Sequence, residues 1–151
     1  MKKNRTRFRN VPLHVEKVKN KQTNKTKKFV LGAVYIHPNV PQEAIDYFMF
    51  QILGAHSEAI RQIFLNMNPD TETPILLCVD FNMDIVQNKS FVNFMKSKFN
   101  LYCITSASTT LGNTCIGLTF TRNISVQTLP YVSYFSYHRP VHNRLMLSSE
   151  Q

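Results

Sequence analysis

Acidic residues are scarce in this sequence. Asp and Glu together number 9 against 18 Lys and Arg, so the formal net charge at pH 7 is +9. The excess lies at one end, because residues 1–28 hold eleven Lys or Arg and a single acid, Glu16. A surface that binds polyanions, if the chain has one, is therefore expected there. A solvated basic terminus or an exposed hairpin explains the same charge equally well.

Cysteine and long apolar runs are also in short supply. The three cysteines, Cys78, Cys103 and Cys115, form no Cys-x-x-Cys pair, and each lies in an apolar, strand-like segment. This favours reduced thiols in an intracellular protein, nuclear or cytoplasmic. No apolar run approaches the roughly 20 residues of a membrane helix. The basic N-terminus lacks the apolar stretch of a secretory signal, so we expect no membrane partner.

What is present is enough for one globular domain, because 43% of the 151 residues are hydrophobic. "VPLHVEKV" alternates apolar and polar residues and "KFVLGAVYI" reads as a buried strand, which together predict an antiparallel hairpin over residues 11–36. After Pro41 a helix is expected, with Gly54 dividing it into two pieces. The apolar positions that form one core-facing stripe are 45, 48, 52, 60, 63, 64 and 67.

The rest of the chain alternates strands and a helix. "ILLCV" is apolar on both faces, which predicts a central strand in a covered sheet, and "KSFVNFMKSKF" predicts a second amphipathic helix. "LYCIT", "CIGLTFT", "VQTLPYVSYFSY" and "VHNRLML" read as successive strands. The fold class is therefore α/β and strand-rich. In such sheets an aspartate directly after a central strand, as in "ILLCVDFN", stands where ligands bind; alternatively, "DFN" only closes the turn.

Four segments resemble the endonuclease/exonuclease/phosphatase superfamily. "AVYIHPN" is similar to its strand ending in tyrosine, "CVDFN" to its GDFN motif, "TCIGLTFTR" to its Ile-Asp strand, and "FSYHRPV" to its Ser-Asp-His-Pro terminus. The resemblance covers about residues 28–145 and implies a DNase I-like, two-layer β-sandwich flanked by helices. It matches only the later part of the family's domain, so residues 1–151 are expected to be one N-terminally truncated, partial domain that begins with the basic segment 1–28. The residues of these motifs are most similar to those of nucleases carried by mobile elements.

The resemblance also implies roles for five residues. Asp80 would orient or deprotonate the attacking water, and Asn82 would hydrogen-bond the phosphate or fix the aspartate. Tyr35 and Asn39 would bind the phosphate or leaving group, and His138 would donate to a phosphoryl oxygen. Each has an ordinary alternative: Tyr35 as a strand aromatic, Asn39 and the Asp80 turn as turn formers, and His138 as a loop residue. Asp84 is interpreted as a solvated carboxylate, and Arg139 and His142 as residues near the site mouth or simply at the surface.

Three departures from the family pattern bear on activity. The family's metal-binding glutamate precedes the matched region, and Glu16 lacks its context, so no metal ligand is assigned. Tyr137 replaces an aspartate, and a phenol is a poor ligand for Mg²⁺. Gly117 replaces the aspartate that would hold His138, and losing such a partner costs on the order of 10⁴ in rate.

The function predicted from the sequence is metal-dependent phosphodiester hydrolysis of nucleic acid, DNA rather than RNA. The expected cofactor is Mg²⁺ or Mn²⁺, held by an incomplete ligand set, so activity is expected to be impaired. The alternatives are a non-catalytic, basic nucleic-acid-binding remnant of a mobile element, and an expressed fragment without function.

Overall fold

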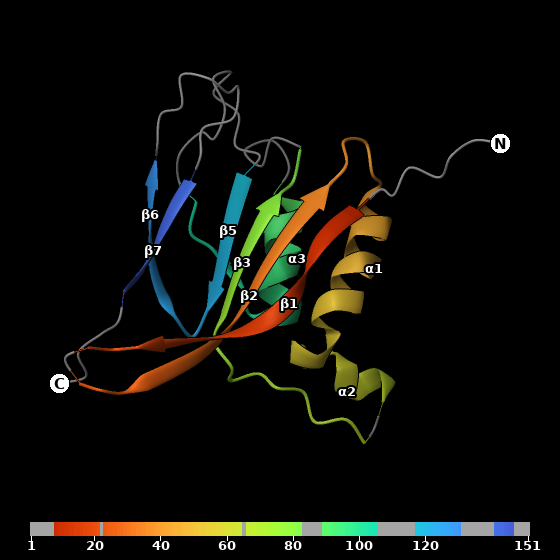
Figure 1. Cartoon of the computed structure of the whole chain (residues 1–151). Coiled ribbons are helices and arrows are strands. Elements are labelled where there is room, and N and C mark those ends of the chain that lie inside the picture. Colours follow the sequence, from red (N-terminus) through yellow and green to blue (C-terminus); the bar gives the residue numbers. More distant parts are fainter. Residues whose placement is uncertain are drawn as a thin grey trace.

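A computed structural model describes residues 8–21, 23–64, 66–82, 89–105, 117–130 and 141–146, with backbone alone for 8–12, 129–130 and 141–142. The elements in chain order are β1 (Phe8–Lys19), β2 (Thr26–Ile36), α1 (Gln42–Leu53), the 3-10 turn η1 (Gly54–His56), α2 (Ile60–Ile63), β3 (Ile75–Asp80), α3 (Ser90–Phe99), β4 (Tyr102–Cys103), β5 (Gly117–Arg122), β6 (Ser125–Pro130) and β7 (Val141–Met146). Figure 1 shows their arrangement.

Five strands form the main sheet in the order β1-β2-β3-β5-β4. β1 and β2 are an antiparallel pair, in agreement with the predicted hairpin. β2 and β3 are parallel, and the chain between them carries α1, as a parallel connection requires. β5 runs antiparallel to β3. The carboxyl ends of β2 and β3 therefore meet at one edge of the sheet.

The main sheet has one face covered by helices and one face turned to a second sheet. On the helix side, alternate residues of β2 and β3 pack with α1 and α3 in one core that includes Val34, Ile36, Leu77, Ile45 and Phe91. The second sheet is the antiparallel pair β6–β7. It contacts the opposite face, since Asn143 of β7 donates from Nδ2 to Cys78 Sγ of β3 at 3.5 Å and accepts at Oδ1 from Thr119 Oγ1 of β5 at 3.2 Å. The described residues thus form two sheets that face each other, with α1 and α3 on the outer face of the larger one.

The predicted break at Gly54 is confirmed, because α1 ends at Leu53 and a 3-10 turn follows. The predicted core-facing stripe is right only in part on α1. Of its positions 45, 48 and 52, Ile45 is buried, and Phe48 and Ile52 are partly buried against the core. Met49 and Leu53, which the prediction left out, complete the buried face of the helix. Beyond the break the prediction is wrong, because the large apolar residues there are solvent-exposed: Ile63 65%, Phe64 55% and Met67 47%.

The reason for that failure is the length of α2. It has four residues, so it makes one turn, and a single turn cannot present a continuous stripe to a core. α2 also lies below the main sheet in Figure 1, away from the face that α1 and α3 cover. Of the helices in the described ranges, none is long and apolar enough to cross a membrane.

Candidate active site at the carboxyl ends of β2 and β3

Asp80 is the last residue of β3, and its neighbour in register on β2 is Tyr35. Residues in register on adjacent strands point to the same face and lie about 4.8 Å apart. Ile75, Leu77 and Val79 face the helices. By strand alternation Asp80 therefore faces the side of the second sheet, and Tyr35 stands beside it. The structure thus brings together two of the five predicted site residues.

One oxygen of Asp80 has an unusual environment. Oδ1 is buried and has no hydrogen-bond partner among the described residues. An unpaired buried polar atom costs on the order of 1–3 kcal/mol, so such atoms are rare and call for an explanation. A hydrogen-bond donor or a cation that does not belong to the described residues, such as one from a bound substrate, would satisfy this oxygen. The ordinary interpretation of Asp80 as a turn-closing residue is not supported at this oxygen.

The turn after Asp80 is held rigidly by the two residues that follow it. Phe81 is 0% exposed and stacks on Phe91 of α3, with 4.4 Å between ring centroids and an interplanar angle of 12°. Asn82 adopts a left-handed backbone, φ 51°, and its Nδ2 donates to the carbonyl of Ile36 at 2.8 Å. This bond ties the end of β3 to the end of β2. Asn82 therefore fixes the site edge, and its contact with phosphate stays a prediction.

Asn39 follows β2 at the same edge of the sheet. It is exposed and has a left-handed backbone, φ 65°, which asparagine tolerates better than most residues. None of the hydrogen bonds between described residues joins it to Asp80. Its turn-forming role is therefore evident in the geometry, and its role as a phosphate ligand stays a prediction.

Gly117 is the β5 residue in register with Asp80. The row across the sheet edge is thus Tyr35, Asp80, Gly117, and the position on the β5 side carries no side chain. The aspartate that the resemblance leads one to expect at this position would have stood next to Asp80. Its replacement by glycine leaves one carboxylate in the row.

His138 lies outside the described residues, as do Asp84, Tyr137 and Arg139, while His142 is described by its backbone alone. The ends of the strands that flank His138 are described. Pro130 of β6 pairs with Val141 of β7, and β6 points in the same direction as β3 in Figure 1. The two flanking strand ends therefore lie on the side of the molecule where β3 ends at Asp80. The role of His138 stays a prediction.

The described residues do not supply a complete magnesium or manganese site. Nowhere in the described ranges do three or more His, Cys, Asp or Glu side chains come together to hold a metal ion. Mg²⁺ prefers carboxylate oxygens, whereas the described residues next to Asp80 supply the phenol of Tyr35, the amide of Asn82 and a glycine, Gly117. The unpaired Oδ1 of Asp80 is one suitable donor, but one donor is not a ligand set.

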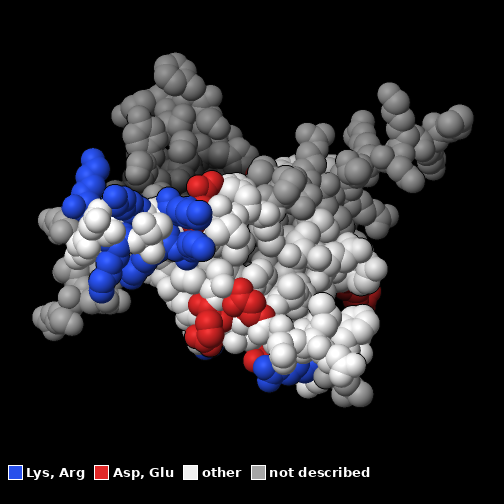
Figure 2. Space-filling view, turned by 60° about the horizontal axis from the view of Figure 1, so that its bottom comes forward, with Lys and Arg blue, Asp and Glu red and all other residues white. Residues whose placement is uncertain are grey.

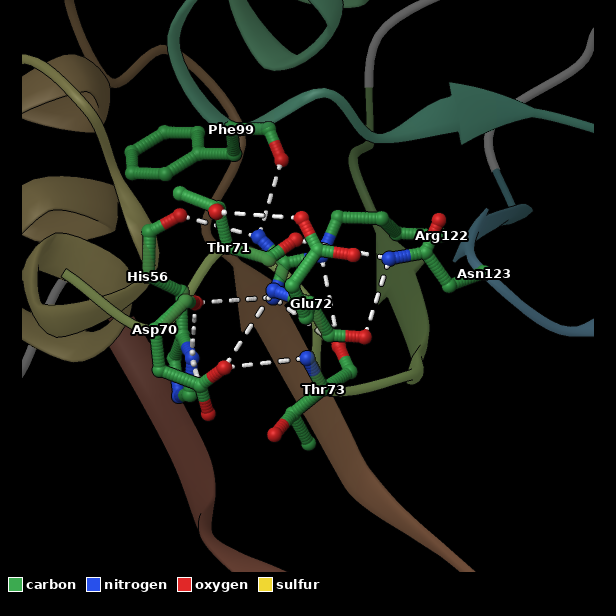
Figure 3. Close-up of polar contacts among 8 residues, drawn as sticks. All are labelled: His56, Asp70, Thr71, Glu72, Thr73, Phe99, Arg122 and Asn123. Carbon is green, nitrogen blue, oxygen red and sulfur yellow. Dashed lines mark hydrogen bonds and ion pairs between the residues drawn. The ribbon is translucent and has the colours of Figure 1, made fainter.

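A second polar cluster, centred on Arg122, lies at the opposite end of β3, where Arg122 is in register with Ile75. The side chain is 2% exposed, and its nitrogen atoms donate to four backbone carbonyls, those of His56, Asp70, Thr73 and Phe99, at 2.9–3.4 Å (Figure 3). Burial lowers the pKa of the guanidinium, while the charges of Asp70 and Glu72 raise it. Arg122 thus joins the ends of β3, β5, α3 and η1.

The surface beside Arg122 is hollowed into a groove of about 380 Å³, lined among others by Glu72, Lys96, Lys98 and Asn123. Because the donors of Arg122 point to carbonyls, they are not available to an anion in this groove. We interpret Arg122 as a structural residue. The sequence-based predictions missed it, although its signal is present: an arginine at the end of an apolar strand, "GLTFTR".

The environment of the Asp70 carboxylate, at this end of β3, predicts that the stability of the fold depends on pH. The hydroxyl of Thr73 is the main reason that the pKa of Asp70 lies below its ordinary value of 3.8, and the backbone N–H of Thr73 also donates to Oδ1 at 2.9 Å. A carboxyl whose folded-state pKa is depressed stabilises the fold above its unfolded-state pKa. We expect the melting temperature of the wild type to exceed that of Asp70→Asn at pH 6. The difference should shrink as pH falls from about 4 toward 2.

Thermal unfolding followed by circular dichroism measures that difference. Thr73→Val is the matched variant, because it removes the hydroxyl donor and keeps the carboxylate. The gap between Thr73→Val and Thr73→Val/Asp70→Asn should be smaller than the gap in the wild-type background. An unchanged gap between pH 6 and pH 2.5 would contradict the assignment.

The comparisons with known proteins agree with this geometry. No protein-family model and no curated protein matches the sequence. The catalytic domain of human Nocturnin, solved with a bound sulfate anion, matches the structure with a TM-score of 0.54 over 92% of this chain at 14% identity. The fold is DNase I-like. The predicted fold class is therefore confirmed.

The likeness to Nocturnin has a limited extent. The chain spans 58% of the length of the Nocturnin catalytic domain, and at 14% identity the match concerns the fold alone. A DNase I-like fold supports a nuclease- or phosphatase-like architecture. The narrower similarity to nucleases of mobile elements stays a prediction.

Proposed function

We propose that this DNase I-like chain is a nucleic-acid phosphodiesterase of the endonuclease/exonuclease/phosphatase type, with its reaction centre at the Asp80 edge and with impaired activity. The observation that carries the proposal is that Oδ1 of Asp80 is buried and has no hydrogen-bond partner among the described residues, at the rim where two parallel strands end. Open α/β sheets bind ligands at that rim. A carboxylate oxygen that no described residue engages is suited to accept a proton from water.

The chemistry assigns one role to each residue. Asp80 would accept a hydrogen bond, and then the proton, from the water that attacks phosphorus, while the opposite P–O bond breaks. Tyr35, Asn39 and Asn82 would donate to the phosphate with neutral groups. His138 would donate to a non-bridging phosphoryl oxygen, whose charge grows in the transition state.

The impairment has two causes in the proposal. Mg²⁺ or Mn²⁺ would supply the charge compensation that phosphoryl transfer needs, and Asp80 is the one carboxylate in its row. Gly117 leaves His138 without the carboxylate that would orient its ring. Origin in a mobile element, an intracellular location and DNA as substrate are further parts of this proposal, and they rest on the sequence motifs, the cysteine content and the basic charge.

A second candidate function is nucleic-acid binding without catalysis. The observation in its favour is the lysine-rich end of the β1–β2 hairpin, which holds Lys17, Lys19, Lys21, Lys25, Lys27 and Lys28. Binding by those residues would neutralise phosphates and weaken steeply with salt. It would not require Asp80.

Hydrolysis of a labelled DNA duplex separates the two candidates. With millimolar Mg²⁺ or Mn²⁺, we expect slow cleavage by the wild type and a decrease of about 100-fold or more, to background, in Asp80→Asn, which keeps the shape and removes the base. Asp46→Asn, a carboxylate on α1, is the control and should leave the rate unchanged. Cleavage by Asp80→Asn at the wild-type rate would show that Asp80 is not the base.

A further inference from the structure

The β1–β2 hairpin extends beyond the main sheet as a free two-stranded arm. β2 pairs with β3 only from Val30 to Tyr35, whereas β1 pairs with β2 as far as Lys19 and Thr26. We call the residues that pair only with each other, Glu16–Lys19 and Thr26–Phe29, together with the turn between them, the basic arm. Four residues of extended strand are about 13 Å long, and the turn adds to this. In Figure 1 the arm projects from the end of the sheet away from the carboxyl end of β3.

The charge on the basic arm is almost entirely positive. It carries six lysines and one acid, Glu16, and that carboxylate is engaged at the base of the arm, 2.9 Å from His14 Nε2. The lysine side chains are exposed. Figure 2 shows them gathered on one projecting part of the surface, with a small acidic patch at their edge and a larger acidic group elsewhere on that face.

The arrangement of the lysines is costly for the free protein. Lys17 and Lys28 are directly opposite each other on the two strands, and Lys19 is two residues further along the same face of the arm. Like charges in register across a strand pair destabilise it. No carboxylate among the described residues is paired with any of these three lysines. An anionic partner that lies against the arm would remove this repulsion.

Shape and composition favour one kind of anion. A two-stranded β-ribbon fits the major groove of duplex DNA, which is about 12 Å wide and has a row of phosphates on each side. A membrane surface would be expected to take up aromatic or apolar side chains at the tip, and the turn from Asn20 to Lys25, "NKQTNK", has none.

We propose that the basic arm enters the major groove of duplex nucleic acid and holds it by neutralising phosphates on both sides of the groove. This rests on the proposed function, since it names the part of the chain that holds the substrate of that reaction. The arm leaves the sheet at the Ile75 end of β3, so holding and hydrolysis use different ends of the sheet. Lysine contacts to phosphate carry no base information, so the arm binds without sequence preference.

The test is the salt dependence of binding to a fluorescent duplex of about two helical turns, measured by anisotropy without divalent metal. The variant is Lys17→Gln/Lys19→Gln/Lys28→Gln. The plot of log K against log salt has a negative slope, and each lost phosphate contact makes it less steep by about 0.9. The slope of the variant should therefore be less steep than that of the wild type by about 2.7. The control is Lys89→Gln/Lys96→Gln/Lys98→Gln, three exposed lysines at and in α3 with the same change of net charge. Its slope should change by less than about one.

A third variant tests charge separately from folding. Lys17→Arg/Lys19→Arg/Lys28→Arg keeps the charge and should bind with the wild-type slope, while thermal unfolding checks that all three variants are folded. Equal slopes for the wild type and the arm Gln variant would overturn the proposal. An equal decrease of the slope in the α3 control would also overturn it, because binding would then depend on the net charge of the protein and not on the arm.

Two further outcomes would also overturn it. Single-stranded DNA of the same charge, bound as tightly and with the same dependence on the arm, would exclude groove insertion. Binding of the arm to phosphatidylserine vesicles but not to the duplex would assign it to a membrane. Because binding without metal does not depend on hydrolysis, an unaltered slope beside Asp80-dependent cleavage refutes the arm alone, and arm-dependent binding without any cleavage refutes the proposed reaction alone.

Discussion

Gly117→Asp is expected to raise the rate of magnesium-dependent DNA cleavage by about 10²- to 10⁴-fold. Gly117 is in register with Asp80 on the neighbouring antiparallel strand. Side chains at such positions have Cβ atoms about 4.5–5.5 Å apart and point to the same face. The substitution therefore puts a second carboxylate beside Asp80, at the position where the family resemblance expects the partner of His138.

The same geometry predicts a second, independent effect of Gly117→Asp. Two carboxylates at this distance repel each other, so the variant should melt at a lower temperature than Gly117→Asn when no divalent cation is present. A cation that prefers carboxylate oxygens would offset the repulsion. Addition of Mg²⁺ should therefore raise the melting temperature of Gly117→Asp more than that of Gly117→Asn, as measured by differential scanning fluorimetry.

Gly117→Asn is the matched control for the rate, because it has the size of aspartate without the charge. It should cleave no faster than the wild type. If Gly117→Asp and Gly117→Asn have the same rate and the same response to Mg²⁺, then the Gly117 position does not limit activity. The cause of the impairment would then have to be sought in the missing metal ligands alone.

Arg122→Met is expected to lower the free energy of unfolding by about 4 kcal/mol. The backbone carbonyls that accept from Arg122 lie in segments that no strand pairing joins directly. The carbonyl of Asp70 keeps a contact with His56 Nδ1 at 3.1 Å, so the substitution leaves three carbonyls, those of His56, Thr73 and Phe99, without the donor that Arg122 supplies, at about 1–3 kcal/mol for each one that is buried. A domain of this size has about 5–15 kcal/mol in total. Urea denaturation should show a markedly lower midpoint, or no cooperative transition.

Two controls give this prediction its meaning. Arg122→Lys keeps the charge but has fewer donors and no planar fork, so its loss should be intermediate. Arg61→Met removes an exposed arginine whose ion pair with Glu58, at 3.3 Å, lies at the surface, and should change stability by less than about 0.5 kcal/mol. If Arg122→Met and Arg61→Met have the same midpoint, then the carbonyl cluster is not stabilising.

The edge that holds Asp80 was predictable because its signals are local. "ILLCV" is apolar on both faces, which requires a covered central strand, and the polar residues that follow must then leave the sheet at its rim. The hairpin was predictable for the same reason, since alternation over "VPLHVEKV" has the period of a strand. Residue spacing within a segment was sufficient in both cases.

Other features depended on contacts between distant segments. The exposure of Phe64 and Met67 follows from where the chain goes after Gly54, which spacing does not contain. The burial of Arg122 depends on carbonyls 23 to 66 residues away in sequence. The pairing of Asp80 with Gly117 required the sheet order, in which β5 and not β4 adjoins β3. These are tertiary relations that no single segment encodes.

The length of the basic arm determines how long a substrate must be in experiments on this protein. The path from Asp80 back along β3 and out along the paired residues of the arm is about 30 Å, since a strand rises about 3.3 Å per residue, and the turn adds to this. That distance equals about nine base pairs of B-form duplex, close to one helical turn. Dinucleotides and chromogenic phosphate esters therefore test only the rim of the sheet, and oligonucleotides of a turn or more are needed before the lysines can influence what is measured.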